Sequence, residues 1–219
     1  MKTKNIDLML SETLAHYNAD QIVQGAYWIT EEQKGCFIGC LTHDDDAQGV
    51  TDRFGIEKPL VKLLENIYEG LKEEESKEFF KAIPTAIGED GKDLSLVKWA
   101  FLRDALKALP TQAKEIQVGI DPVIKGIALL AAGKLWPDAA RATADADAAR
   151  ATADADAACA TAAAYVAARA AAAAARAAGY PGYAAYCADA AADAARAAGY
   201  VAERRRQAAS ILALISAAK

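Results

Sequence analysis

Apolar residues recur three and four positions apart through most of residues 1–136, the spacing that gives a helix one buried face. Pro59 suits the first turn of one such helix, in which leucine and isoleucine residues follow at helical spacing. A short helix is predicted to contain Phe79 and Phe80 and to end at Pro84. Further helices are predicted near Ser11, Asp93 and Thr111, the last with a kink at Pro122.

Residues 30–43 carry the start signal of a helix. Thr30, with Gln33 three positions later, forms a capping box in which each side chain bonds the backbone N–H of the other residue. This helix is predicted to reach about His43. No stretch of the chain shows the sustained alternation of apolar and polar positions that is typical of strands. The sequence therefore predicts an all-α fold with a multi-helix N-terminal module.

Composition changes abruptly after Trp136 and Pro137, where alanine becomes the dominant residue. Residues 1–136 contain 16 Lys and Arg against 22 Asp and Glu, whereas residues 137–219 contain 9 against 8. We therefore predict two domains, an acidic helical module over residues 1–136 and an alanine-rich helical module over residues 137–219.

The alanine-rich module contains a nonapeptide at residues 140–148 that is repeated at residues 149–157. Alanine is the best helix former, so residues 138–178 are predicted to form one helix and the chain to return antiparallel from Tyr183. Nine residues make about two and a half turns, which leaves alanine-only faces on two opposite sides of the helix. Such a helix is expected to be a middle layer in layered or coiled-coil-like packing. A second copy of the chain would supply a neighbour, which predicts a homo-oligomer.

Charge and cysteine content narrow the class of protein. The 219 residues carry a formal net charge of −5 with a pI near 5.2, opposite in sign to the basic footprint of proteins that bind duplex nucleic acid. The longest apolar run, residues 126–133, is flanked by lysines and too short to span a membrane. Four cysteines without an export signal indicate reduced thiols in a cytoplasmic protein.

Half of the cysteines and both histidines offer candidate chemistry. On a helix, Cys36, Cys40 and His43 stand at i, i+4 and i+7 and share one face, and His16 belongs to the preceding helix. Two thiolates and two imidazoles are a ligand set for tetrahedral zinc. Alternatively, Cys36 lies near a helix start beside Lys34 and is a thiolate nucleophile with a histidine as its base.

A third interpretation makes the same cysteines packing residues. Gly35 and Gly39 are also four positions apart and form, with the cysteines, a small-residue seam suited to close packing. The sequence leaves the three interpretations open. The acidic triplet at residues 44–46 lacks the spacing of a calcium loop and is expected to be solvated.

Two groups of residues are candidates for ligand binding. Tyr27 and Trp28 precede the predicted helix start, where free N–H groups and Lys34 favour an anion. These rings are a platform for a nucleotide base or, alternatively, a hydrophobic staple into the core. The only basic triplet consists of Arg204, Arg205 and Arg206 and suits phosphate groups or an acidic partner. Three adjacent arginines cannot share one buried face, so at least one is expected to serve binding.

Three blocks of sequence carry a resemblance: residues 17–28 (YNADQ followed by GAYW), residues 34–43 (KGCFIGCLTH) and residues 54–56 (FGI). With an alanine-rich tail behind them, they resemble a family found in bacteriophages and bacterial genomes, and the similarity covers most of the chain. The resemblance implies origin in a mobile element, with counter-defence or regulatory binding in the cytoplasm of the host cell.

The sequence therefore predicts a small non-enzymatic helical protein that binds and inhibits a host defence factor or sequesters a nucleotide-like anion. One alternative is a thiol- or zinc-dependent enzyme that uses Cys36, Cys40, His43 and His16. Another is a structural assembly protein built on the alanine helices. Nucleotide-binding loops and common hydrolase signatures are absent from the sequence.

Overall fold

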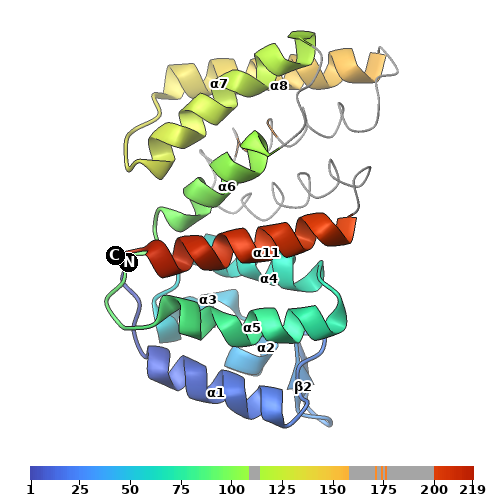
Figure 1. The fold of residues 1–219 in the computed structure, drawn as a ribbon, viewed down its shortest axis with the longest axis vertical. Coiled ribbons are helices and arrows are strands. Elements are labelled where there is room, and N and C mark those ends of the chain that lie inside the picture. Colours follow the sequence, from blue (N-terminus) through green and yellow to red (C-terminus); the bar gives the residue numbers. More distant parts are fainter. Residues whose placement is uncertain (109–113, 158–170, 172–173, 175, 177–199) are drawn as a thin grey trace. The chain divides into compact units, whose positions relative to one another are not determined.

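The computed structural model describes residues 1–108, 114–157, 171, 174, 176 and 200–219 (Figure 1). These residues are mostly helical, with one two-stranded hairpin, so the prediction of an all-α fold is confirmed. The chain forms two compact units. The first unit consists of Met1–Val97 together with Arg204–Lys219, and the second consists of Lys98–Glu203. The boundary predicted from composition near residue 137 divides the chain differently and stays a prediction.

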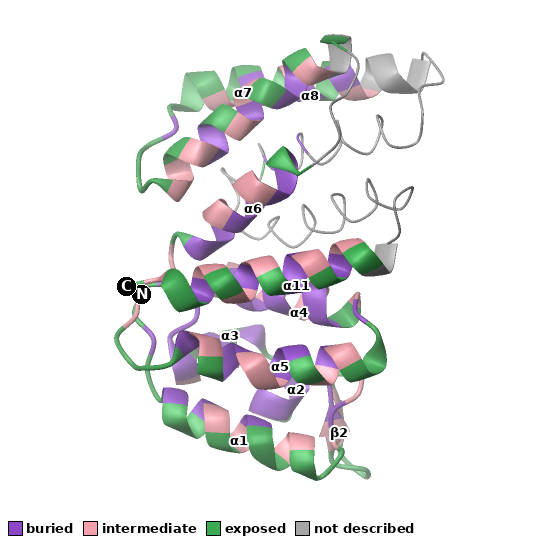
Figure 2. Cartoon of the chain, viewed as in Figure 1, coloured by how far each residue is buried: buried purple, intermediate pink, exposed green. Residues whose placement is uncertain are grey.

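The first unit contains short helices around a core of leucine, isoleucine and phenylalanine. Its elements are α1 (Ile6–Asn18), β1 (Trp28–Ile29), β2 (Lys34–Gly35), α2 (Phe37–Thr42), α3 (Ala47–Phe54), α4 (Lys58–Glu69), α5 (Glu73–Ile87) and most of α11 (Tyr200–Ala217). Pro59 lies in the first turn of α4 as predicted, and the apolar face of this helix is buried (Figure 2). Helix α1 packs along α5, and α2 packs against α3 and α4.

The helix predicted over residues 30–43 is wrong. Residues 28–35 form an antiparallel hairpin in which Trp28 pairs with Gly35 and Ile29 with Lys34, and helix α2 begins only at Phe37. Gln33, the proposed capping partner of Thr30, has a positive φ of 54° and lies in the turn of the hairpin. The left-handed backbone at this position ends any helical path from Thr30.

Two predicted helix limits also differ. Ser11 is not a cap, because α1 begins at Ile6 and the Ser11 hydroxyl donates to the carbonyl of Leu8 within the helix. Pro84 does not end its helix, since α5 runs from Glu73 to Ile87. A proline near a helix end removes only one hydrogen bond, and the surrounding packing of α5 in the core outweighs that loss.

The second unit contains α6 (Val97–Lys107), α7 (Lys114–Ala131) and α8 (Asp138–Ala157) among its described residues; Val97 itself belongs to the first unit. The apolar face predicted after Asp93 is buried, although α6 begins four residues later. Helix α7 continues through Pro122. The start predicted at Thr111 lies outside the described residues, as do the alanine helix beyond residue 157 and its return from residue 183.

Helix α8 packs along α7 through one alanine face only. Ala144, Ala148 and Ala151 are buried, whereas Ala146 on the opposite side is exposed. Gly119 of α7 permits this close approach, because a Cβ at Gly119 would lie 2.8 Å from the Cβ of Ala151. Within the described part of α8, α7 covers one of the two alanine faces, and the opposite face is exposed in the single chain. A second copy of the chain as a neighbour stays a prediction.

The ends of the first unit meet at one place. Lys2 forms a bridge with Asp93, and the N–H of Asp93 donates to the carbonyl of Lys219 at 2.8 Å. The labels of the two termini accordingly lie side by side in Figure 1. No helix in the described part of the chain combines the length and the apolar character needed to cross a membrane.

Candidate functional site

The hairpin is fixed to the rest of the first unit by backbone hydrogen bonds. The N–H of Cys36 donates to the carbonyl of Ala26 at 2.8 Å and shares a longer bond of 3.2 Å with the carbonyl of Tyr27. On its other edge, the N–H of Gly35 donates to the carbonyl of Gln21. Gly35, the pairing partner of Trp28, is thus held on both sides, and the carbonyl of Tyr27 accepts a hydrogen bond from Cys36.

Glycine is required where the hairpin meets α2. A Cβ at Gly39 would lie 1.4 Å from the carbonyl oxygen of Tyr27, and a Cβ at Gly35 would lie 2.3 Å from the same atom. Both distances are far inside van der Waals contact. The predicted small-residue seam of Gly35 and Gly39 is present, and it receives the backbone of the hairpin rather than a second helix.

Trp28 and the two histidines form one aromatic cluster. The rings of Trp28 and His43 are stacked, with centroids 4.3 Å apart and 23° between their planes. His16 meets both rings edge-on, at 5.9 Å from Trp28 and 5.6 Å from His43. His43 is exposed and has a left-handed backbone with φ 57°, where it ends α2. The outer ring of the stack therefore faces solvent.

The pKa of His16 is lowered from its usual value, chiefly by burial. The hydrogen bond to Gln21 partly opposes the lowering, and the neighbouring His43 adds to it. Nδ1 of His16 lies 2.9 Å from Oε1 of Gln21. His16 is thus favoured in its neutral form and has a fixed orientation beneath the stack.

Tyr27 is the exposed aromatic residue of the hairpin, with 41 % of its surface accessible. The Lys62 ammonium lies over its ring, 5.4 Å from the centroid, and pairs with Glu65 at 2.8 Å. The pKa of Tyr27 is raised, first by the charge of Glu65 and then by burial, and Asp45 adds to the shift. The charges of Glu65 and Asp45 therefore act on Tyr27, and Lys62 opposes them.

We call the group of Tyr27, Trp28, His43, Asp44 and Asp45 the hairpin face, in which His43 stacks on Trp28 and the charge of Asp45 acts on Tyr27. Asp44 and Asp45 directly follow His43 and are exposed, as expected for a solvated loop. Sequence reasoning missed Lys62 and Glu65 as neighbours of Tyr27. They come from α4, and no sequence signal connects residues that only tertiary packing brings together.

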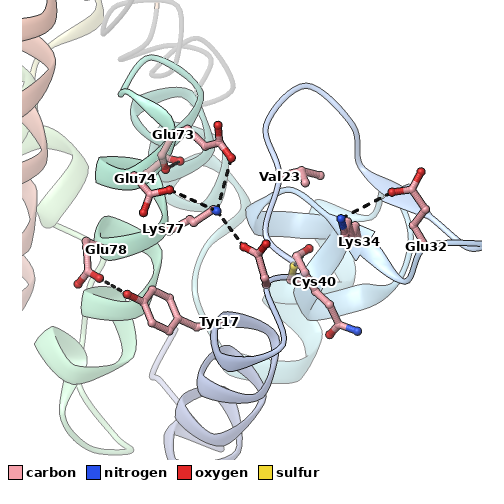
Figure 3. A network of polar contacts seen from close by, with 12 residues as sticks. Tyr17, Val23, Glu32, Lys34, Cys40, Glu73, Glu74, Lys77 and Glu78 are labelled. Carbon is pink, nitrogen blue, oxygen red and sulfur yellow. Dashed lines mark hydrogen bonds and ion pairs between the residues drawn. The ribbon is translucent and has the colours of Figure 1, made fainter.

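Lys34 was predicted to bind an anion, but its ammonium group faces a carboxylate of the protein itself. Its ammonium lies 3.8 Å from Oε2 of Glu32, as the dashed line in Figure 3 shows. Lys77 of α5 is surrounded in the same way by three acids, with its ammonium 2.9 Å from Asp20, 3.4 Å from Glu73 and 3.5 Å from Glu74 (Figure 3). These lysines are neutralised within the protein.

Cys36 and Cys40 are buried free thiols. Burial raises the pKa of Cys36 to about 11, and burial together with the charge of Cys36 raises the pKa of Cys40 to about 12. The Cys40 thiol donates to the carbonyl of Gly35 at 3.2 Å. Both thiols stay protonated at neutral pH and are therefore weak nucleophiles.

The predicted zinc ligands do not come together as a site. Within the described residues there is no group of three or more His, Cys, Asp or Glu side chains that could hold a metal ion. His16 and His43 meet each other and Trp28, and neither imidazole hydrogen-bonds to a cysteine thiol in that part of the chain. The interpretation of the cysteines as packing residues is the one that this arrangement favours.

The arginine triplet is engaged in the fold of the first unit. Arg204 is only 1 % exposed, and its Nη1 donates to Oδ1 of Asn66 at 3.0 Å and to Oε1 of Gln207 at 3.1 Å. Arg205 pairs with Glu75 at the start of α5. Arg206 is half-buried and also has partners. This placement gives Arg204 a structural role, and it does not bring the triplet to the hairpin face as a joint anion site.

Comparisons of the chain with protein-family models, with curated proteins and with solved structures found no match.

Proposed function

We propose that this is a non-enzymatic binding protein whose hairpin face contacts a protein partner. The observation that carries the proposal is Tyr27, a large aromatic side chain that is 41 % exposed and whose backbone carbonyl is held by the N–H of Cys36. Tyrosine and tryptophan are enriched among the residues that dominate binding energy. A rigid hairpin also presents them with little loss of conformational entropy on binding.

The other functions considered have less support. A thiol enzyme needs a thiolate, and the raised pKa values of Cys36 and Cys40 keep both sulfurs protonated. A nucleotide-like anion would meet the charges of Glu65 and Asp45 near Tyr27, and Lys34 is already paired with Glu32. An assembly built on α8 would have to bury the side that carries Ala146, where exposed alanines lie beside the exposed and charged Arg150.

The resemblance to phage and bacterial sequences supports a partner in the host cell. A small binding protein that occupies the surface of a host defence factor would inhibit it by steric exclusion, without chemistry of its own. We include this role in the proposal, with the host cytoplasm as the location.

Site-specific photo-crosslinking tests the proposal in bacterial cells. A photoreactive phenylalanine analogue is placed at Tyr27 and, as a matched control, at Leu8 of α1, which is 45 % exposed in the same unit. We expect one discrete cross-linked protein from position 27 that is absent from position 8. Identical cross-links from both positions, or none from position 27, would overturn the hairpin face as the contact surface.

A further inference from the structure

We propose that the partner presents a basic, arginine-bearing segment, whose guanidinium groups stack on the rings of the hairpin face and pair with Asp44 and Asp45. This inference rests on the proposed function and names the chemistry of its partner. It follows from three properties of the surface: a stack of rings open to solvent, carboxylates beside the rings, and neutralised lysines.

The stack offers a flat surface to a flat cation. His43 lies 4.3 Å from Trp28 and is exposed, so the stacked pair ends in solvent. On the inner side, a Cβ at Gly35 would lie 2.9 Å from the Trp28 ring, which shows how closely the backbone covers that side. A guanidinium group is planar and stacks on aromatic rings, whereas an ammonium group is a compact, strongly hydrated charge.

Carboxylates next to the rings select a cation. Asp44 and Asp45 follow His43 and are exposed, and the charges of Glu65 and Asp45 reach the Tyr27 hydroxyl. The two nearest lysines are occupied, Lys62 by Glu65 at 2.8 Å and Lys34 by Glu32 at 3.8 Å. Complementary charges of this kind favour the correct partner and accelerate its association.

The charge of the whole first unit has the same sign. Met1–Val97 and Arg204–Lys219 together contain 14 Lys and Arg against 19 Asp and Glu. At low ionic strength this field attracts a basic protein surface over about one Debye length. The same field repels nucleic acid, so a protein segment is the occupant that the charges favour.

The test measures binding of short peptides to the full chain by titration calorimetry. The probes are hexa-arginine, hexa-lysine and hexa-glutamate. We expect hexa-arginine to bind several-fold more tightly than hexa-lysine, to lose affinity as salt is added, and hexa-glutamate not to bind. Equal affinity for the two basic peptides would refute stacking.

Matched variants locate the binding. Asp44→Asn with Asp45→Asn should weaken hexa-arginine binding roughly three- to tenfold, the effect of two exposed ion pairs. Tyr27→Ala should weaken it about tenfold or more. The control is Glu73→Gln with Glu74→Gln, which removes two exposed charges of the same unit and leaves Lys77 paired with Asp20. Equal losses in the acidic pair and in the control would mean nonspecific attraction and overturn the proposal.

A second measurement covers the case in which Tyr27→Ala fails to fold. The chain has only two histidines, so their imidazole proton signals are readily assigned by NMR with a His16 variant. Hexa-arginine should shift the signal of His43 more than that of His16, and an unmoved His43 signal would contradict the site. If crosslinking at Tyr27 finds a partner that hexa-arginine does not displace, the proposed function stands and this inference fails.

Discussion

Arg204→Ala is the substitution that most directly tests how α11 is attached to the first unit. The side chain is 1 % exposed and its guanidinium donates to Asn66 of α4 and Gln207 of α11. It also fills the space above Gly70, where a Cβ would lie 2.3 Å from its Nε. Gly70 follows the last turn of α4, and a cation is favoured at the carboxyl end of a helix.

The magnitude follows from these contacts. Hydrogen bonds to a charged group are worth about 1.5–3 kcal/mol each, and the amide oxygens of the half-buried Asn66 and the buried Gln207 would lose a donor. Loss of these two bonds should lower the free energy of unfolding by about 3–5 kcal/mol. With an m-value of about 1–3 kcal/mol per molar urea, the unfolding midpoint falls by 1 M or more.

Urea unfolding followed by Trp28 fluorescence is the assay, in a Trp99→Phe, Trp136→Phe background so that the signal reports the first unit. Arg205→Ala is the control, because that side chain is largely exposed and its pair with Glu75 should contribute little. An unchanged midpoint for Arg204→Ala would refute the reasoning. The sequence predicted a binding role for the arginine triplet; the structure predicts instead that a variant with all three arginines replaced by Gln is destabilised through Arg204.

Three further outcomes are expected. Ala148→Leu should overpack the seam with α7 and destabilise the protein by about 1–3 kcal/mol in thermal unfolding, while Ala146→Leu on the exposed side should change stability by less than about 0.5 kcal/mol; equal effects would contradict the one-sided packing. In a background without the other two cysteines, Cys36 and Cys40 should react with a thiol reagent at pH 7.5 only as fast as the protein unfolds, and a chelator should leave the melting temperature unchanged. Fast labelling of the folded protein would disprove that these thiols are buried and protonated. Because the pKa of His16 is lowered from 6.5 in the folded state, the unfolded chain binds its proton more readily, so His16 should stabilise the fold fully above pH 6.5 and progressively less below it; a His16→Gln variant that keeps the wild-type loss of urea stability between pH 7.5 and 5.5 would refute this.

The sequence predicted most of the helices because each has an apolar face whose residues recur at helical spacing. Helix α4, with Pro59 in its first turn, is the clearest case, since its buried positions follow one another at helical spacing over three turns. The failure at residues 30–43 has a physical cause. Thr30 and Gln33 satisfy the capping pattern, but tertiary contacts hold Gln33 in a left-handed turn and bring Trp28 beside Gly35.

The candidate site was predicted only in part. The sequence assigned base stacking to Trp28 and metal or acid–base chemistry to His16 and His43. Their common cluster was not predicted, because it joins a strand to the ends of two helices. Arg204 shows the opposite limit. Three consecutive arginines suggest a binding surface, and only the glycine at position 70 and the amide at position 66, far away in the sequence, create the buried space that accepts one of them.

The first unit is assembled from two stretches of chain that flank the whole second unit, which has a consequence for synthesis. On the ribosome, residues 98–203 must be made before Arg204 and the buried face of α11 exist. At about 5–20 residues per second, this interval lasts roughly 5–20 s. During that time Asn66 lacks its partner Arg204, and Ile211 and Ile215, which are buried in the folded protein, have not yet been made. The nascent first unit is therefore incomplete while the second unit is translated, and it is a natural substrate for chaperones that recognise exposed apolar surface.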